Sequence, residues 1–291
     1  MSLSQRTKLL APAKLGLYEK AMPNHLTWPA KLAAARQAGY DFVEISIDET
    51  AEKLARLDWP AIERRQLRQE MDLAGIRIET MCLSGHRKYP LGSPDEAIRR
   101  ESLAIMARAI DLAVDLGVRI IQLAGYDTYY DPSTEQTRAW FAENLAVSAD
   151  LASREGVILG FETMETPFMD TVGKAMAYVD VIDSPYLQVY PDIGNLTNAS
   201  LIYGRSVPDD LDTGRGHICA AHLKETIPGH YREIPYGTGH TDFRHLVPKL
   251  QDMGVHRFTA EFWHVGEPDW QAVLSGNAQF LRPFFTNQPA G

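Results

Sequence analysis

Four short apolar segments in the second half of the chain each run into a side chain that binds divalent metal ions. These side chains are Glu162, Asp192, His222 and Glu261. They lie 30, 30 and 39 residues apart, close to the length of one β-strand plus one α-helix. If the strands are parallel and close into a barrel, all four side chains lie at the barrel end where (β/α)8 enzymes build their active sites.

A single acidic residue at a strand end is most often a salt-bridge partner or a helix cap. Four such groups at one barrel rim would repel one another and lose their hydration unless a cation neutralised them. Three carboxylates and one imidazole suit Mn2+, Zn2+, Co2+ or Mg2+, and the lack of thiolate ligands disfavours a structural zinc site. The pattern predicts one divalent metal ion, whose identity stays open, and no residues that bind another cofactor.

The rest of the chain alternates between short apolar runs and longer segments with helical periodicity. The expected strands are Lys14–Glu19, Phe42–Ile47, Ile76–Leu83, Val118–Ala124, Val157–Met164, Leu187–Ile193, Ile218–Lys224 and Phe258–Trp263. The expected helices are Trp28–Ala38, Pro60–Ala74, Pro94–Leu116, Thr134–Arg154, Val172–Ile182, a poorly defined one near Val207–Arg215, Phe243–Met253 and Asp269–Phe284.

Glycine follows five of these helices, where a residue with a left-handed conformation commonly ends a helix. These glycines are Gly39, Gly75, Gly117, Gly156 and Gly254. Strictly alternating strands and helices predict an α/β fold with a parallel sheet, and eight units favour a closed TIM barrel over an open sheet. We expect residues 1–291 to form a single (β/α)8 catalytic domain.

The composition excludes several classes of partner. Twenty-nine basic and 38 acidic residues give a net charge of −9, and no Lys/Arg-rich tract offers a footprint for nucleic acid or an anionic membrane. No segment approaches the 18 apolar residues of a membrane span. The two cysteines, Cys82 and Cys219, lie in apolar runs and form no disulfide framework, so we expect a cytoplasmic protein.

Several motifs resemble the sugar phosphate isomerases and epimerases of the xylose-isomerase-like superfamily. The motifs around the four side chains are Gly160–Met164, Tyr190–Asn195, Ala221–Glu225 and Thr259–Trp263, and further ones are Leu17–Ala21, Phe42–Ser46, Met81–Arg87, Ile121–Tyr126 and Tyr236–Gly239. The similarity covers nearly the whole chain and is strongest to the L-ribulose-5-phosphate 3-epimerases, also called L-xylulose-5-phosphate 3-epimerases.

This resemblance implies that Glu162, Asp192, His222 and Glu261 bind the metal ion and that Glu162 and Glu261 are also the catalytic acid/base pair. The implied reaction interconverts L-xylulose 5-phosphate and L-ribulose 5-phosphate through an enediolate, as a step of L-ascorbate or related pentose breakdown. The expected partner is a small phosphorylated ketopentose, and we also expect a homo-oligomer, specifically a dimer.

Contacts to the substrate are less well determined by the sequence. The candidates are Glu44, His86, Arg87, Glu165, Lys224 and Arg232. The basic members would bind the phosphate, whereas the two glutamates would accept hydrogen bonds from sugar hydroxyls. The alternative for each basic residue is an ordinary solvated loop charge.

Rival functions use the same scaffold. Epimerases of free ketoses share the four ligands, but there a histidine is expected three residues after the aspartate and an arginine six residues after the histidine. This chain has Asn195 and Pro228 at those positions, which argues against a free-sugar enzyme. A ketose 3-epimerase or aldose–ketose isomerase acting on another sugar stays open. A phosphodiester hydrolase is disfavoured by the net charge and the few histidines, and a binding protein has no use for two such carboxylates.

Overall fold

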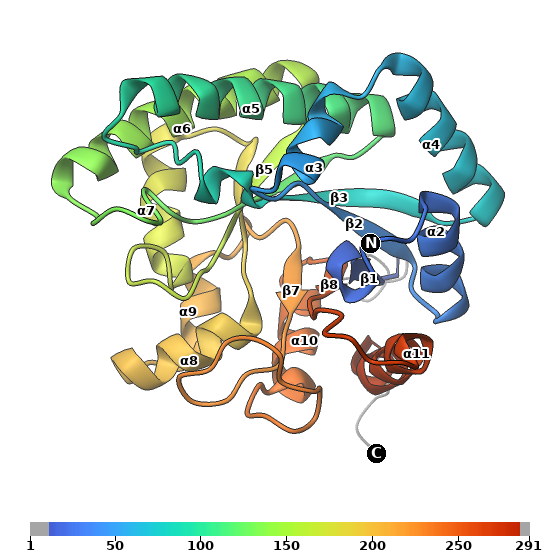
Figure 1. The fold of residues 1–291 in the computed structure, drawn as a ribbon. Helices are drawn as coiled ribbons and strands as arrows, with labels where there is room; N and C mark the ends of the chain where they lie inside the picture. Colours follow the sequence, from blue (N-terminus) through green and yellow to red (C-terminus); the bar gives the residue numbers. More distant parts are fainter. Residues whose placement is uncertain (1–11, 286–291) are drawn as a thin grey trace, which may run out of the picture.

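Eight parallel β-strands form the centre of the computed structural model, which describes residues 12–285. Figure 1 shows the strands inside a layer of helices. The strands are β1 (Lys14–Tyr18), β2 (Phe42–Ser46), β3 (Arg77–Leu83), β4 (Ile120–Leu123), β5 (Ile158–Glu162), β6 (Leu187–Tyr190), β7 (Ala221–Leu223) and β8 (Arg257–Ala260). Each strand overlaps the segment expected for it from the sequence.

The strands pair in the order β6-β5-β4-β3-β2-β1-β8-β7, with parallel neighbours throughout. Pairing of β1 with β8 places the first and last strands side by side. Between β6 and β7, isolated parallel bridges join Val189 to Ile218 and Asp192 to His222. Parallel strands that are joined by helices and closed in this way make a (β/α)8 barrel, so the predicted fold class is confirmed.

Helices follow the strands and cover the outside of the barrel (Figure 1). They are α2 (Trp28–Gln37), α3 (Ala51–Leu54), α4 (Ala61–Ala74), α5 (Glu96–Leu116), α6 (Glu135–Glu155), α7 (Val172–Ile182), α8 (Ile193–Tyr203), α9 (Val207–Thr213), α10 (Phe243–Asp252) and α11 (Trp270–Leu281). Three long helices end at glycines with positive φ, namely Gly75, Gly117 and Gly156, as their sequence positions predict.

The sequence pattern does not predict helix α8, because it favours an extended chain as far as Ile193. In the structure β6 ends at Tyr190, and the helix begins at Ile193. The Asp192 side chain accepts a hydrogen bond from the Asn195 backbone N–H at 2.8 Å, which caps the helix. The extended segment therefore ends three residues earlier than the apolar pattern indicates, because the Asp192 carboxylate caps the helix that follows.

The apolar core lies between the barrel and its helices. It joins strand residues such as Leu17, Val43 and Leu159 to helix residues such as Leu67 and Phe141, all fully or almost fully buried. Burial of apolar surface on this scale is the main force that holds the helices against the barrel. The helices thereby fix the strands, and the strands fix the side chains at their ends.

A buried charged cluster ties the end of β1 to the segment that follows β2. The Glu19 carboxylate contacts the Lys31, Lys53 and Arg56 side chains at 2.6, 2.5 and 2.6 Å, and it accepts the Ser46 N–H at 2.9 Å. All these side chains are buried. Such a cluster keeps buried charges paired, and it holds in place the residues on either side of Glu19, which are Tyr18 at the end of β1 and Lys20 in the turn that follows.

None of the helices within residues 12–285 combines the length and the apolar character that a bilayer-spanning segment requires.

Candidate active site

The barrel brings the four predicted metal-binding side chains together at the carboxyl ends of neighbouring strands. Glu162 is the last residue of β5, Asp192 follows β6, His222 lies in β7 and Glu261 follows β8. Each offers one ligand atom, and these atoms all lie within 4.8 Å of one another. All four residues are buried. A parallel barrel places strand ends at one face, which explains why residues so far apart in the sequence meet here.

His222 is held between carboxylates on both sides of its ring. Its Nδ1 lies 3.0 Å from Glu162 Oε1 and 3.5 Å from Glu261 Oε2, whereas its Nε2 lies 2.7 Å from Glu44 Oε1. Burial alone would lower the pKa of His222, but Glu44 and then Glu261 raise it well above its usual value. With Nε2–H donated to Glu44, a metal ion held among the four side chains would take the place of the proton on Nδ1 and leave the ring neutral.

Glu44 is fixed inside the barrel by its own hydrogen bonds. Its Oε2 accepts the Thr80 hydroxyl at 2.7 Å and the Tyr190 hydroxyl at 2.9 Å, and Tyr190 also meets Thr259 Oγ1 at 2.9 Å. The Glu44 side chain is fully buried and does not border the cavity described below. This placement does not support the expected contact of Glu44 with sugar hydroxyls, and it puts the carboxylate in position to orient His222 instead.

The two carboxylate oxygens of Asp192 have different roles, one in capping a helix and one in the site. Its Oδ1 accepts the N–H of Asn195, and its Oδ2 lies 2.9 Å from Lys224 Nζ. Burial raises the pKa of Asp192 to about 8; Lys224 opposes this rise, whereas Glu261 and Glu162 add to it. Several carboxylates therefore compete here for few cationic partners.

Glu162 and Glu261 differ in their surroundings. Burial, followed by the nearby Glu261 charge, raises the pKa of Glu162, whose Oε2 accepts a hydrogen bond from the Gln122 amide. Burial acts in the same direction on Glu261, but Lys224 and then His222 lower its pKa well below the usual value. Two carboxyl groups whose environments shift their pKa values in opposite directions are suited to act as an acid and a base.

The residues present fit a divalent metal ion. Asp192 Oδ2 and Glu261 Oε2 are buried and accept no hydrogen bond of good geometry from the described residues. Three carboxylates and one imidazole make an oxygen- and nitrogen-donor set suited to Mn2+, Zn2+, Co2+ or Mg2+. Cys82 borders the cavity, but burial raises the pKa of its thiol to about 12, so it carries a proton at neutral pH.

A cavity of about 60 Å³ is bordered by two of the four residues, Glu162 and Glu261, and by other residues at the ends of strands or in the segments that follow them. Its basic residues include Lys20, Arg87 and Arg232. Arg87 lies 4.8 Å from the centre of the Tyr129 ring, and Arg232 lies 3.3 Å from Glu165. The cavity therefore has carboxylates at one part of its wall and the cations Lys20, Arg87 and Arg232 at another.

The predicted substrate contacts are not all brought to this cavity. Arg87, Glu165, Lys224 and Arg232 border it. His86 does not: its Nε2 lies 3.1 Å from the Ser102 carbonyl oxygen, and burial lowers its pKa to about 4. A buried neutral imidazole is unsuited to a phosphate, so this placement does not support the expected phosphate contact of His86.

Sequence reasoning missed two contributors to the site. Lys20 borders the cavity and forms an ion pair with Asp48. Gln122 holds Glu162 from the neighbouring strand β4. Gln122 carried a readable signal, because it is the single polar residue in the buried run Ile120–Leu123.

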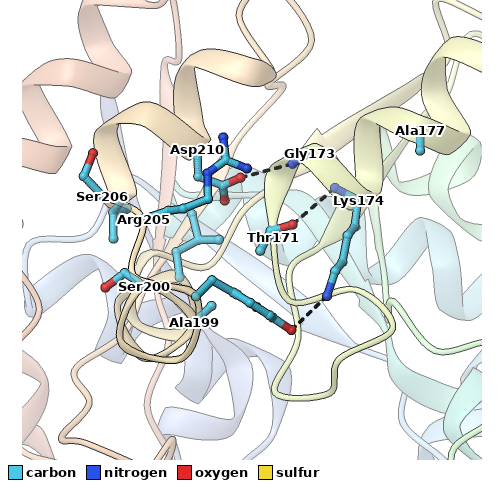
Figure 2. A pocket seen from close by; sticks show the side chains of 12 residues that line it. Thr171, Gly173, Lys174, Ala177, Ala199, Ser200, Arg205, Ser206 and Asp210 are labelled. Atoms are coloured by element: carbon cyan, nitrogen blue, oxygen red, sulfur yellow. Dashed lines mark hydrogen bonds between the residues drawn. The ribbon is translucent and has the colours of Figure 1, made fainter.

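A larger cavity of about 600 Å³ lies elsewhere, between α7, α8 and α9 (Figure 2). Lys174 crosses its wall to the Tyr203 hydroxyl at 3.0 Å, and Asp210 accepts the Gly173 N–H at 3.2 Å. None of the four clustered residues borders this cavity. Its size alone does not make it the reaction site, because the groups suited to acid/base and metal chemistry lie around the smaller cavity.

Comparison with known sequences identifies the family of the chain. The model of the xylose isomerase-like TIM barrel family matches residues 32–284. The L-ribulose-5-phosphate 3-epimerase UlaE of Salmonella heidelberg is 44% identical over 250 residues, which cover 86% of this chain and 87% of that protein. The protein of the same name from Salmonella typhimurium is 45% identical over the same shares.

Solved structures agree on the fold. The D-allulose 3-epimerase of Methylomonas sp. in complex with D-allulose superposes with a TM-score of 0.76 at 17% identity and covers 94% of this chain and 98% of its own. An L-ribulose 3-epimerase gives a TM-score of 0.75 at 18% identity, with 94% of both chains covered. From the family match and the identity to the Salmonella proteins, the chain belongs to the xylose isomerase-like TIM barrel family.

Proposed function

We propose that this protein is a metal-dependent 3-epimerase that interconverts L-xylulose 5-phosphate and L-ribulose 5-phosphate. The observation that carries the proposal is the placement of Glu162 and Glu261 at one cavity, 3.0 and 3.5 Å from the same His222 nitrogen. The names of the Salmonella relatives, at 44% and 45% identity over most of both chains, support the substrate.

Glu162, Asp192, His222 and Glu261 would hold one divalent metal ion, which is Mn2+, Zn2+, Co2+ or Mg2+. Bound there, the ion supplies Lewis acidity that polarises the substrate carbonyl and makes the neighbouring C–H more acidic. Glu44 keeps the His222 ring in the required tautomer through the 2.7 Å contact to Nε2. Gln122 keeps the Glu162 carboxylate aimed at the cavity.

Epimerisation at C3 needs one group that removes the proton from one face and another that returns a proton to the opposite face. Glu162 and Glu261 fill these roles in the proposal, because both border the cavity and their pKa values are shifted in opposite directions. Glu261, beside Lys224 at 3.1 Å, is kept ionised, whereas burial favours the protonated form of Glu162. Reversal of the reaction exchanges the two roles.

Arg87, Arg232 and Lys20 would bind the phosphate, since they are the cavity's cations that lie outside the carboxylate cluster. Glu165, which accepts the Tyr126 hydroxyl at 2.8 Å, would contact a sugar hydroxyl. Ligand pockets usually measure about 300–1,000 Å³, and this cavity measures about 60 Å³. Substrate binding therefore requires outward movement of bordering side chains, of which Arg232 is 43% exposed.

The alternative is a ketose 3-epimerase or aldose–ketose isomerase that acts on another sugar. At position 195, where a free-ketose epimerase is expected to have a histidine, the Asn195 side chain donates to the Thr163 carbonyl at 2.7 Å. The Asn195 amide thus has a structural role, because it links α8 to the segment that follows β5. This supports a phosphorylated substrate over a free sugar.

Proton NMR in D2O tests the proposal. Metal-loaded protein is mixed with L-ribulose 5-phosphate and, separately, with the unphosphorylated sugar. We expect deuterium at C3 together with L-xylulose 5-phosphate, and little turnover of the free sugar. Exchange at C1 would identify an isomerase, and no exchange at any carbon would refute the proposed chemistry.

Further parts of the proposal concern the whole protein. Residues 1–291 act as one catalytic domain, which is supported by the closure of β1 against β8 near the two ends of the chain. A homodimer is supported by the apolar residues Leu201, Ile202 and Tyr203 at the end of α8, which are 41–63% exposed. A cytoplasmic location, with a role in L-ascorbate or pentose breakdown, is supported by the free thiols and by the relatives' names.

A further inference from the structure

Lys224 lies among the proposed metal ligands, although the sequence analysis expected it at the phosphate. Its Nζ is 2.9 Å from Asp192 Oδ2 and 3.1 Å from Glu261 Oε2. The side chain is only 6% exposed, and Nζ lies 6.0 Å from the centre of the Trp263 ring. Because residue 224 directly follows β7, the strand that carries His222, the barrel itself fixes this ammonium beside the carboxylates.

The oxygens that face Lys224 are those that a metal ion would use. Asp192 Oδ1 accepts the Asn195 N–H that caps α8, so Oδ2 is the oxygen left for a ligand bond. Glu261 Oε2 faces His222 Nδ1 at 3.5 Å, on the ligand side of the ring. An ammonium and a divalent ion therefore draw on the same two oxygens.

We propose that Lys224 is a positioning residue that competes with the metal ion for Asp192 and Glu261 and so limits the affinity of the centre. This inference rests on the metal centre of the proposed function. The fixed positive charge aligns the two carboxylates, and it repels a second cation at short range in a buried site. Lys224 thereby keeps the centre weaker than its four ligands alone would make it.

The competition predicts that a substitution inside the site strengthens metal binding, whereas most substitutions there would weaken it. Removal of a ligand weakens metal binding, and general damage to a buried site does the same. Removal of the Lys224 charge instead leaves Asp192 and Glu261 without their cation and takes away the repulsion. Metal binding therefore becomes tighter when Lys224 is made neutral, which no merely structural role would produce.

The test is calorimetric titration of Mn2+ into the full chain after removal of metal with EDTA. For Lys224→Met we expect a dissociation constant at least about tenfold lower than that of the wild type. Lys224→Arg keeps the charge and should stay within about threefold of the wild type. Asp192→Asn, which removes a ligand, should shift the constant in the opposite direction.

Lys20→Met is the matched control, since Lys20 borders the same cavity but pairs with Asp48 instead of a ligand. We expect its Mn2+ dissociation constant to change less than about threefold, because its charge lies farther from the ligands. Lys224→Gln is the second neutral variant and retains a hydrogen-bond donor; it should also bind Mn2+ more tightly, and it carries the test if Lys224→Met does not fold.

An unchanged or weaker Mn2+ affinity in a folded neutral variant of Lys224 overturns the inference. Failure of the wild type to bind Mn2+ overturns it as well, together with the proposed centre. The readout is separate from that of the epimerase proposal, because titration is made without sugar. Tighter binding by a protein that shows no C3 exchange would support the competition and reject the epimerase.

Discussion

Replacement of Glu44 by glutamine separates its role behind His222 from a role in sugar binding. The substitution keeps the size of the side chain and removes the charge that faces His222 Nε2 at 2.7 Å. The amide oxygen can still accept Nε2–H, and the amide NH2 then faces the Thr80 and Tyr190 hydroxyls, which rotate to accept it. The hydrogen bonds therefore survive while the negative charge is lost.

The expected cost is a loss of metal affinity. Loss of a carboxylate partner behind a metal-binding histidine typically lowers metal affinity about 10–100-fold, or about 1.4–2.8 kcal/mol. We expect the upper part of this range, because His222 is fully buried. Burial disfavours charge on the ring, and Glu44 is the strongest of the groups that oppose this effect. KM for the sugar phosphate at saturating metal should change little, since Glu44 does not border the cavity.

Calorimetric titration of Mn2+ into EDTA-treated protein measures the change, and sugar kinetics at high Mn2+ complete the assay. Thr80→Val is the matched control, because it removes one hydrogen bond to Glu44 but keeps the charge. Its metal affinity should stay within about threefold of the wild type. Unchanged metal affinity in Glu44→Gln, together with a raised KM, would refute the reasoning and restore Glu44 as a sugar contact.

Three further predictions concern catalysis, the phosphate and pH. Glu162→Gln and Glu261→Gln should each lower the rate of C3 deuterium exchange by about 10²–10⁴-fold or more, with metal content measured in parallel; near-normal exchange in either would reject the two-carboxylate scheme. Arg87→Ala should raise KM for the phosphorylated sugar about 10–100-fold with little effect on kcat, whereas Lys88→Ala, which lies outside the cavity, should not; equal KM values would remove Arg87 from the phosphate site. His86 has a pKa of about 4 in the fold against about 6.5 when unfolded, so protonation favours the unfolded chain and stability falls as the pH drops from 6.5 towards 4. Urea unfolding should show that the wild type loses about 2 kcal/mol more than His86→Gln between pH 7.5 and pH 5, and equal losses would contradict a buried neutral imidazole.

The fold was largely readable because two local signals coincide at most boundaries. Apolar runs marked the strands, and glycines such as Gly75, Gly117 and Gly156 marked where helices end. Helix α8 was missed because its first residues continue an apolar run. The signal that ended the strand was a capping contact between Asp192 and Asn195, and a carboxylate interpreted as a ligand was not also interpreted as a cap.

The site was only partly readable for a different reason. Parallel barrels send strand ends to one face, so the meeting of Glu162 and His222 followed from spacing alone. Spacing does not tell which atom a side chain faces. Glu44 contacts His222 across the barrel, and Lys224 contacts Asp192. His86 is buried against the Ser102 carbonyl oxygen, away from the cavity. These directions depend on packing between residues far apart in the sequence.

The junction between β6 and β7, here called the seam of the barrel, is joined within residues 12–285 only by isolated bridges, and the proposed metal ligands lie on both sides of it. Three backbone hydrogen bonds hold it: from Val189 to His217, from Cys219 to Val189 and from His222 to Pro191, at 2.8–3.0 Å. Asp192 stands on one side of this seam and His222 on the other, bridged as a pair. A cation bound to both residues would link β6 to β7 and so stabilise the closed barrel. Slower amide exchange at Cys219 and His222 on addition of Mn2+ would then report a more stable junction between β6 and β7.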